Sequence, residues 1–159
     1  MNTVLGMVQD HHVAEDLTQE VFVTVYKSLI SFNEKSSLST WIYRITVNKC
    51  IDHLRSKNVK KRSGFLSAIF MKDSGETAVE ATDFNHPGVQ IENREKSKYL
   101  FKALNTLPEN QKTVFILTYM EDLPQKEVAE IMDMTVKGVE SLLQRAKGNL
   151  RKYLSDLDI

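Results

Sequence analysis

Polar and charged side chains recur along residues 137–147 at spacings that place most of them on one side of a helix. Their types suit base edges and phosphates: Lys137, Glu140, Ser141, Gln144, Arg145 and Lys147. These side chains indicate a binding surface and not a catalytic site. The chain has no glycine-rich phosphate loop, no nucleophile motif and no paired carboxylates that packing would leave over.

Metal ligation is the other chemistry to consider, and it would point to an enzyme. His11, His12 and Glu15 lie close in sequence, but adjacent histidines point to different sides of a helix. The remaining candidate ligands are isolated: Cys50, His53 and His86. The sequence therefore predicts no catalytic residues, no metal and no cofactor.

The residues around this polar face have the pattern of a helix-turn-helix. Small Ala129 falls where two short helices would cross, and Thr135 can cap the second helix. Asp133 and Met134 would make the turn, and Gly138 permits close approach. Apolar side chains occupy the positions that such a unit buries: Val128, Met132, Met134, Val139 and Leu142. A helix-turn-helix over about 125–147 would bind duplex DNA, whereas an ordinary helical hairpin with a solvated face is the alternative.

The rest of the chain predicts an all-α fold of two small helical domains joined by a flexible linker. Residues 14–30 place Leu17, Val21, Val25 and Leu29 one turn apart. A break at 31–37 is followed by a helix that Ser39 or Thr40 can cap and that continues to about residue 57. No period is sustained from 60 to about 91, although 65–71 is apolar enough for a short packed helix.

Helical signals resume at about residue 94. Four apolar residues there share one face: Tyr99, Leu100, Ala103 and Leu104. Pro108 and Pro124 stand where proline favours the start of a helix.

Charge is balanced overall, with 21 Lys and Arg against 21 Asp and Glu in 159 residues, but it is unevenly distributed. Basic residues gather in 44–62 and 145–152, and acidic residues in 10–20 and 73–95. Such a chain can contact DNA and also a basic protein surface. One cysteine excludes an internal disulfide, and no run is apolar enough for membrane insertion, so we expect a cytoplasmic protein.

Two blocks of sequence resemble a known family. The run LFKALNTLPENQKTVFILTYMEDLPQKEVAEIMDMTVKGVESLLQRAKGNLRKYL is similar to region four of bacterial sigma factors. AEDLTQEVFVTVYKSLISF and LSTWIYRITVNKCIDHLRSK resemble region two. Their order resembles the compact extracytoplasmic-function (ECF) group, which implies region two at 1–60, a linker at 61–93 and region four at 94–159.

The resemblance implies a subunit that binds core RNA polymerase and helps open promoter DNA. Region two would contact core polymerase through Asp16, Leu17, Gln19, Glu20 and Phe22. It would bind the minus-ten element as a single strand through Phe32, Tyr43, Arg44, Asn48, Lys49 and Arg55. The polar face at 137–147 would then bind the minus-thirty-five element, and an anti-sigma factor is an expected partner.

Aromatic and basic side chains are the types that bind unstacked bases, which supports this assignment. Trp41 and Tyr43 point to different faces of one helix, and we expect Trp41 to be buried or half-buried.

The chain departs from the family pattern in two respects. It lacks a stretch of helix that usually precedes the position of Asn2, so region two is expected to be short at its N-terminus. Glu140 and Leu142 stand where many relatives carry Arg or Lys, which makes the predicted recognition helix less basic.

Two other functions remain possible at this stage. A helix-turn-helix regulator that does not join polymerase would explain 125–147 but would leave the first block without a role. A pure interaction module that regulates a sigma factor would show no salt-dependent binding to promoter duplex.

Overall fold

The computed structural model describes residues 1–70 and 99–155, with side chains for 1–59 and 99–155. Every regular element in these ranges is helical, and none of the described residues forms a strand. The all-α prediction is confirmed. We call residues 1–59 the N-terminal unit and residues 99–155 the C-terminal unit.

The N-terminal unit consists of α1 (Asn2–Val8), α2 (His11–Ser28) and the first part of α3 (Leu38–Phe70). Asp10 caps α2 by accepting a hydrogen bond from the Val13 amide at 3.1 Å. Ala14, Leu17 and Val21 then recur at helical spacing and are buried.

The start of α3 and the end of α2 both differ from the sequence prediction. The cap of α3 is Ser37, whose hydroxyl accepts from the Thr40 amide at 3.0 Å, so Ser39 and Thr40 already lie inside the helix. Leu29 is 49% exposed, because the backbone there has tightened into the 3-10 turn Leu29–Ser31, and that changes the direction of its side chain.

Helix α3 is longer than predicted. Its backbone stays helical to Phe70, beyond the expected end near residue 57 and through the first ten residues of the predicted linker. The expected packing of the apolar stretch 65–71 and the acidic segment 73–95 lie outside the described residues.

The C-terminal unit begins with helical residues 99–105. It continues through α5 (Glu109–Phe115), the π-helical turn η2 (Ile116–Met120), α6 (Gln125–Ile131) and α7 (Val136–Ser155). Pro108 and Pro124 directly precede α5 and α6, as predicted.

A small apolar cluster joins the start of this unit to α7. Ala103 and Leu104 pack with Ala146 and Leu150 of α7, whereas Tyr99 and Leu100 remain 45% and 41% exposed. Tyr99 and Leu100 each precede one of these residues by four positions and so share their side of the helix, but only Ala103 and Leu104 are buried in this cluster.

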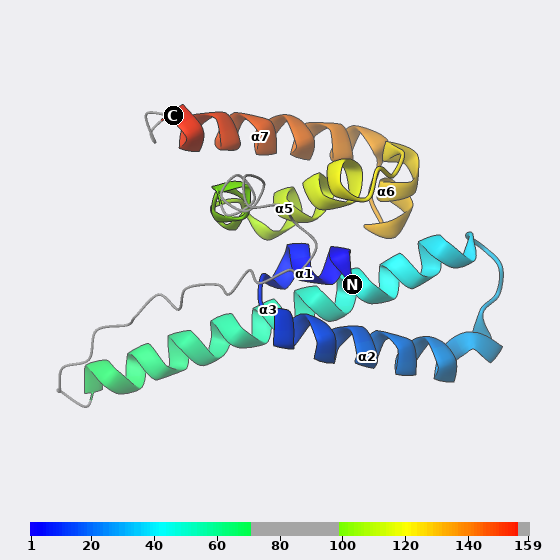
Figure 1. Ribbon diagram of the computed structural model, residues 1–159, viewed down its shortest axis with the longest axis horizontal. Helices are drawn as coiled ribbons and strands as arrows, with labels where there is room; N and C mark the ends of the chain where they lie inside the picture. The colour runs from blue at the N-terminus through cyan, green and yellow to red at the C-terminus, as the bar shows by residue number, and fades with distance from the viewer. Residues whose placement is uncertain (71–98, 156–159) are drawn as a thin grey trace, which may run out of the picture.

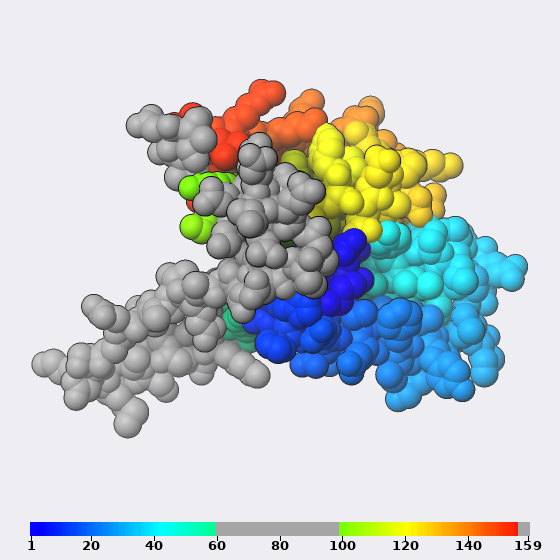
Figure 2. Space-filling model, viewed as in Figure 1, coloured from blue at the N-terminus to red at the C-terminus, as the bar shows by residue number. Residues whose placement is uncertain are grey.

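The two units are packed against each other. In Figure 1, α7 lies at the top, α5 and α6 lie beneath it, and α1 lies between α5 and the α2–α3 pair. One apolar core crosses between the units, with Val4, Met7, Leu17, Val47 and Cys50 on one side and Val114, Ile116, Leu117, Val128 and Val139 on the other. We call the contact between the units the seam. Figure 2 shows α6 seated directly on the first turns of α3.

Candidate nucleic-acid interfaces

The helix-turn-helix is formed by α6 and α7, as the sequence predicted. Ala129 is 5% exposed at the crossing, and Val128 and Val139 are fully buried. Thr135 caps α7 by accepting a hydrogen bond from the Gly138 amide at 3.1 Å. Asp133 takes a positive φ of 51° in the turn, a conformation that aspartate tolerates better than most residues.

One buried position of α7 was assigned to the wrong residue. Leu143 is 4% exposed, whereas Leu142 is only half-buried. The helix buries residues 139, 143, 146 and 150, a spacing of four, three and four that keeps them on one side. Leu142 therefore lies at the edge of this buried stripe, next to the polar face.

The polar face of α7 points away from the N-terminal unit. Lys137, Glu140, Gln144, Arg145 and Lys147 are exposed, and Ser141 is half-buried. The Lys147 ammonium lies 4.9 Å from the centre of the Tyr119 ring, at a cation–π distance. Since α7 lies at the opposite edge of the molecule from α2 and α3 (Figure 1), a duplex can approach this face.

The predicted minus-ten surface lies on α3 and the turn before it. The rings of Phe32 and Trp41 are in contact, with 5.0 Å between their centroids and a tilt of 39°. Both side chains are half-buried, which confirms the expectation for Trp41. Arg44, Asn48 and Arg55 follow at spacings of four and seven, so the structure places them on one side of α3. Lys49 lies on another side, where it binds Glu20 of α2 at 3.1 Å.

The C-terminal unit contacts part of this surface. The Tyr43 hydroxyl donates to a carboxylate oxygen of Glu121 at 2.9 Å, and the Arg44 guanidinium donates to the Glu130 carbonyl. Arg55 pairs with Glu109 at 3.3 Å. Half of the predicted minus-ten residues are thus engaged across the seam.

These contacts change the chemistry of Tyr43. Burial, together with the hydrogen bond to Glu121 and the nearby charges of Glu121 and Glu127, raises the pKa of Tyr43 to about 12. The phenol therefore stays protonated and continues to donate. Beside it, Thr40 donates to Glu127 at 3.0 Å.

A buried polar network forms the other end of the seam. Lys112 of α5 donates to the Met7 carbonyl at 2.7 Å and to the Asn105 side chain at 2.9 Å. Gln9 donates to the Phe101 carbonyl at 3.0 Å and accepts from Asn105. Burial lowers the pKa of Lys112 to about 8.

The seam residues Lys112, Glu109, Glu121 and Glu127 were not predicted as site residues from the sequence. One signal was present, because Lys112 precedes the apolar Ile116 by four residues and must share its face of the helix. The glutamates at 109, 121 and 127 carried no such signal, because an exposed acid and an acid that meets another unit look alike in a sequence.

The predicted polymerase-binding residues lie on α2. Asp16, Gln19 and Glu20 are exposed, and Phe22 is 70% exposed, which is unusual for so large an apolar ring. Leu17 is different: it is 5% exposed and packs in the core, so its predicted contact with a partner must be corrected to a role in supporting the helix.

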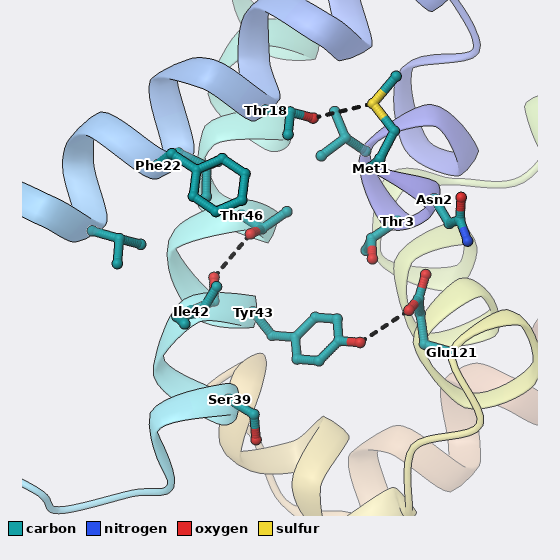
Figure 3. Close-up of a pocket in the computed structure, with 13 residues that line it drawn as sticks. Met1, Asn2, Thr3, Thr18, Phe22, Ser39, Ile42, Tyr43, Thr46 and Glu121 are labelled. Atoms are coloured by element: carbon teal, nitrogen blue, oxygen red, sulfur yellow. Dashed lines mark hydrogen bonds between the residues drawn. The ribbon is translucent and has the colours of Figure 1, made fainter.

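A pocket opens beside Phe22. It has a volume of about 450 Å³ and lies between the start of α1, α2, α3 and Glu121. Figure 3 shows that Tyr43 crosses one end of it to reach Glu121, so the seam forms part of its wall.

Two further kinds of site are absent from the described residues. No group of three or more potential metal ligands comes together there. None of the helices in these ranges is long and apolar enough to cross a bilayer.

The fold and its polar surfaces define an all-helical protein suited to nucleic acid, and comparison with known proteins gives the family. Residues 1–59 match the model of Sigma-70 region 2, and residues 97–150 match that of Sigma-70, region 4. The chain is 33% identical over 153 residues to the ECF RNA polymerase sigma factor SigW of Bacillus subtilis, covering 95% of the chain and 80% of that protein. It is 30% identical over 132 residues to the ECF RNA polymerase sigma-E factor of Escherichia coli strain K12, covering 83% and 69%.

Solved structures show the same fold. The sigma factor RpoE, in complex with the anti-sigma factor NepR from Bartonella quintana, has a TM-score of 0.65 at 21% identity, covering 96% of this chain and 88% of that one. CnrH, in complex with the cytosolic domain of CnrY, has a TM-score of 0.67 at 19% identity, covering 98% and 79%.

The chain belongs to the ECF RNA polymerase sigma factors. Its function is therefore to direct promoter-specific transcription as a specificity subunit of RNA polymerase, and the family is not one of enzymes.

Proposed function

We propose that the two polar surfaces divide promoter recognition between them, with α7 binding the minus-thirty-five element as duplex. The observation that carries this proposal is the exposed face of α7. Its contacts would come from Lys137, Glu140, Ser141, Gln144, Arg145 and Lys147. Arg and Lys can bind guanine edges or phosphates, and Gln can bind adenine. Glu140 can accept from cytosine but repels phosphate, so its place on this face favours a base contact.

For the minus-ten element, we propose recognition as a single strand on α3. The half-buried Phe32–Trp41 pair offers an aromatic platform for an unstacked base, and exposed Asn48 can bind its polar edge. Arg44 and Arg55 would bind the backbone on the same side of α3, with Tyr43 beside them. Lys49 would bind the backbone only after leaving Glu20.

Core polymerase would bind the outer face of α2. Asp16, Gln19 and Glu20 supply negative charge, and Phe22 supplies an exposed aromatic anchor. An aromatic side chain among carboxylates suits a basic helical partner, because apolar burial gives affinity and charge sets orientation and association rate.

The proposed domain division follows from these roles. Residues 1–60 would act as region two, 61–93 as the linker and 94–159 as region four. Since the protein would work on polymerase and promoter DNA, we propose that it acts in the cytoplasm.

An anti-sigma factor is a further proposed partner, because the sigma factor RpoE, which has this fold, is solved in complex with the anti-sigma factor NepR. It would hold the two units and cover their DNA surfaces. Purification from the native host under mild conditions should recover it, whereas a free protein that is always active would count against it.

Transcript mapping tests the whole proposal. The chain is added to core polymerase with genomic DNA of its host, and the initiated transcripts are sequenced. We expect a small set of start sites that share two upstream elements. A helix-turn-helix regulator that does not join polymerase would give no new starts and would not be retained by core enzyme in a pull-down.

A further inference from the structure

Tyr119 lies in the π-helical turn η2, at the edge of the polar face of α7. The Lys147 ammonium lies 4.9 Å from the centre of its ring. The ring is 47% exposed, so it borders the surface that a duplex would approach. Tyr119 comes from an element that precedes the helix-turn-helix, yet it contacts one of the cations proposed to bind DNA.

The turn η2 sets the place of this ring. Within it the Glu121 amide donates to the Ile116 carbonyl at 3.1 Å, five residues back, whereas an α-helix bonds four residues back. Ile116 and Leu117 are buried in the core, and Tyr119 is left at the surface beside α7. Turns of this kind are rare and are frequently found at functional sites.

Phe115 supports the Tyr119 ring from the protein side. The two ring centroids are 4.9 Å apart, with a tilt of 46° between the rings. Phe115 is half-buried and packs against the apolar cluster that contains Ala146 and Leu150 of α7. Ala146 directly precedes Lys147 in the chain. The position of the Tyr119 ring relative to Lys147 is therefore set by packing on α7 and is not a chance meeting of two surface side chains.

An aromatic ring orients an ammonium group without neutralising it. A carboxylate partner would cancel the charge and would take hydrogen bonds that a phosphate needs, as Glu20 does with Lys49 at 3.1 Å. The face of a ring attracts a cation but has no net charge, and an ammonium group has three donors. Lys147 can therefore keep its contact with Tyr119 while it binds a phosphate.

The place of Lys147 on α7 suits a phosphate better than a base. It lies about three turns after Val136, the first residue of the helix, and at the edge of the buried stripe beside Leu143 and Ala146. Residues in the first turns of a recognition helix are those that contact bases. A cation further along the helix contacts the DNA backbone, where it fixes the position of the protein on the duplex.

We propose that Tyr119 is a positioning residue for promoter binding, and that its ring holds the Lys147 ammonium in place for a phosphate of the minus-thirty-five duplex. This proposal rests on the assignment of α7 to that duplex made above. A free lysine side chain loses conformational entropy when it binds, and a side chain that is already held loses less. The gain in affinity should be about threefold, because exposed cation–π contacts are weak.

Variants of the full chain test this role. Tyr119→Leu removes the ring and keeps an apolar side chain, whereas Tyr119→Phe keeps the ring and removes only the hydroxyl. Lys147→Met removes the ammonium. The matched control is Tyr99→Leu, because Tyr99 is 45% exposed in the same unit and lies outside the proposed contacts.

The readout is the affinity for a short duplex that carries the upstream element found by transcript mapping, measured by fluorescence anisotropy at several salt concentrations. Tyr119→Leu should weaken binding about threefold without changing the slope against salt, because the number of phosphate contacts stays the same. Tyr119→Phe and Tyr99→Leu should bind like the unchanged protein. Lys147→Met should reduce the slope by about one. Tyr119→Leu should cause no further loss when it is combined with Lys147→Met, because the ring acts only through the ammonium.

Proton NMR of the free protein supplies an independent readout of the contact. The face of an aromatic ring shifts the resonances of nearby protons upfield. The ε-methylene resonance of Lys147 should therefore lie upfield in the unchanged protein and in Tyr119→Phe, and should return to its ordinary position in Tyr119→Leu. Circular dichroism should show the same helix content in all variants.

Several results would overturn the proposal. If Lys147→Met weakens binding but Tyr119→Leu does not, the ring does not position the ammonium. Equal losses in Tyr119→Phe and Tyr119→Leu would show that the hydroxyl contacts DNA directly. A further loss in the double variant would show that Tyr119 acts independently of Lys147. If Lys147→Met changes neither affinity nor slope, the assignment of Lys147 to the duplex fails, and the role of Tyr119 fails with it.

Discussion

The two proposed DNA surfaces of this chain differ in availability more than in chemistry. Both combine cations with polar side chains that can bind bases. The face of α7 is exposed, whereas the face of α3 donates to glutamates and a carbonyl of the other unit. Residue types can therefore predict a surface for nucleic acid, but they do not show whether the folded chain leaves that surface exposed.

The difference follows from how each helix is packed. The buried stripe of α7, which ends at Leu150, packs on its own unit. The polar side of the helix is therefore exposed to solvent. α3 packs on α1 and α2 through residues such as Val47 and Cys50 while its first turns also meet α6 (Figure 2). A helix between two units has less free surface than one at the edge.

The largest effect is expected from breaking the helix-turn-helix. Val139→Asp puts a charge into a fully buried position without a partner and should lower the free energy of unfolding by about 3 kcal/mol or more. Duplex binding through α7 should disappear with it.

Thermal unfolding followed by circular dichroism gives the measurement. Val136→Asp is the control, because Val136 lies on the same helix and is 40% exposed, so the change should be under about 1 kcal/mol. Equal losses in the two variants would show that α7 is not buried as described.

The next effect concerns the α3 surface alone. Phe32→Ala removes the ring that contacts Trp41 and should reduce open-complex formation with core polymerase about tenfold or more, at a promoter found by transcript mapping. Duplex binding at the minus-thirty-five element should not change.

Tyr26→Ala is the matched control for Phe32. Tyr26 is an aromatic residue of α2 that is 82% exposed and lies outside the proposed minus-ten surface. If both variants open promoters as well as the unchanged protein, Phe32 is not a platform for a base.

The converse variant tests the α7 surface. Arg145→Ala should weaken duplex binding about tenfold and reduce the slope of affinity against salt by about one. Binding to single strands should be unaffected. Lys102→Ala removes an exposed cation of the same unit outside the proposed contacts, and its effect should be much smaller. Equal effects would mean that this unit attracts DNA only through its overall charge.

The smallest effect concerns the polar end of the seam. Because burial lowers the pKa of Lys112 to about 8, the unfolded chain holds this proton at pH values where the folded chain loses it. The free energy of unfolding should therefore rise between pH 7 and about pH 8.5, by under about 1 kcal/mol. At higher pH the raised pKa values of Cys50 and Tyr43, both about 12, act in the opposite direction.

Chemical denaturation at a series of pH values measures this slope. Lys112→Met should abolish the rise, although it also leaves the Met7 carbonyl without its donor. Lys102→Met, at an exposed position, should retain the rise. Parallel curves for the two variants would show that Lys112 is not the titrating group.

Local features were predicted well because they depend on neighbours in the sequence. Thr135 caps α7 and Ala129 lies at the crossing, as their types and spacing required. The predicted cap and the predicted buried position were wrong where two residues of the same type, one or two positions apart, could each fill the same role. Ser37 caps α3 instead of Ser39, and Leu143 is buried instead of Leu142. The cap depends on the residue at which the helix begins. Which leucine is buried depends on the helix phase, because a shift of one residue turns a side chain by about a quarter turn.

The sequence predicted which residues belong to each candidate site, but it predicted only in part which of them lie on the surface. Leu17 has the apolar type of a contact residue, but the position of α3 against α2 buries it. Phe22 has the type of a core residue and is exposed. The spacing of Ala14, Leu17 and Val21 places Leu17 on the apolar stripe of α2, but how much of Phe22 beside that stripe is covered depends on where the neighbouring helix lies.

The sequence by itself determined the helical class, the helix-turn-helix and the residue types of both proposed DNA surfaces, because helix periodicity, capping and side-chain chemistry act over a few residues. Only the tertiary structure decided which of those surfaces is free. Tyr43 and Glu121 are 78 positions apart, and their hydrogen bond exists only because two units pack with one apolar core between them. The accessibility of the proposed minus-ten surface is therefore a property of the seam and not of α3 alone.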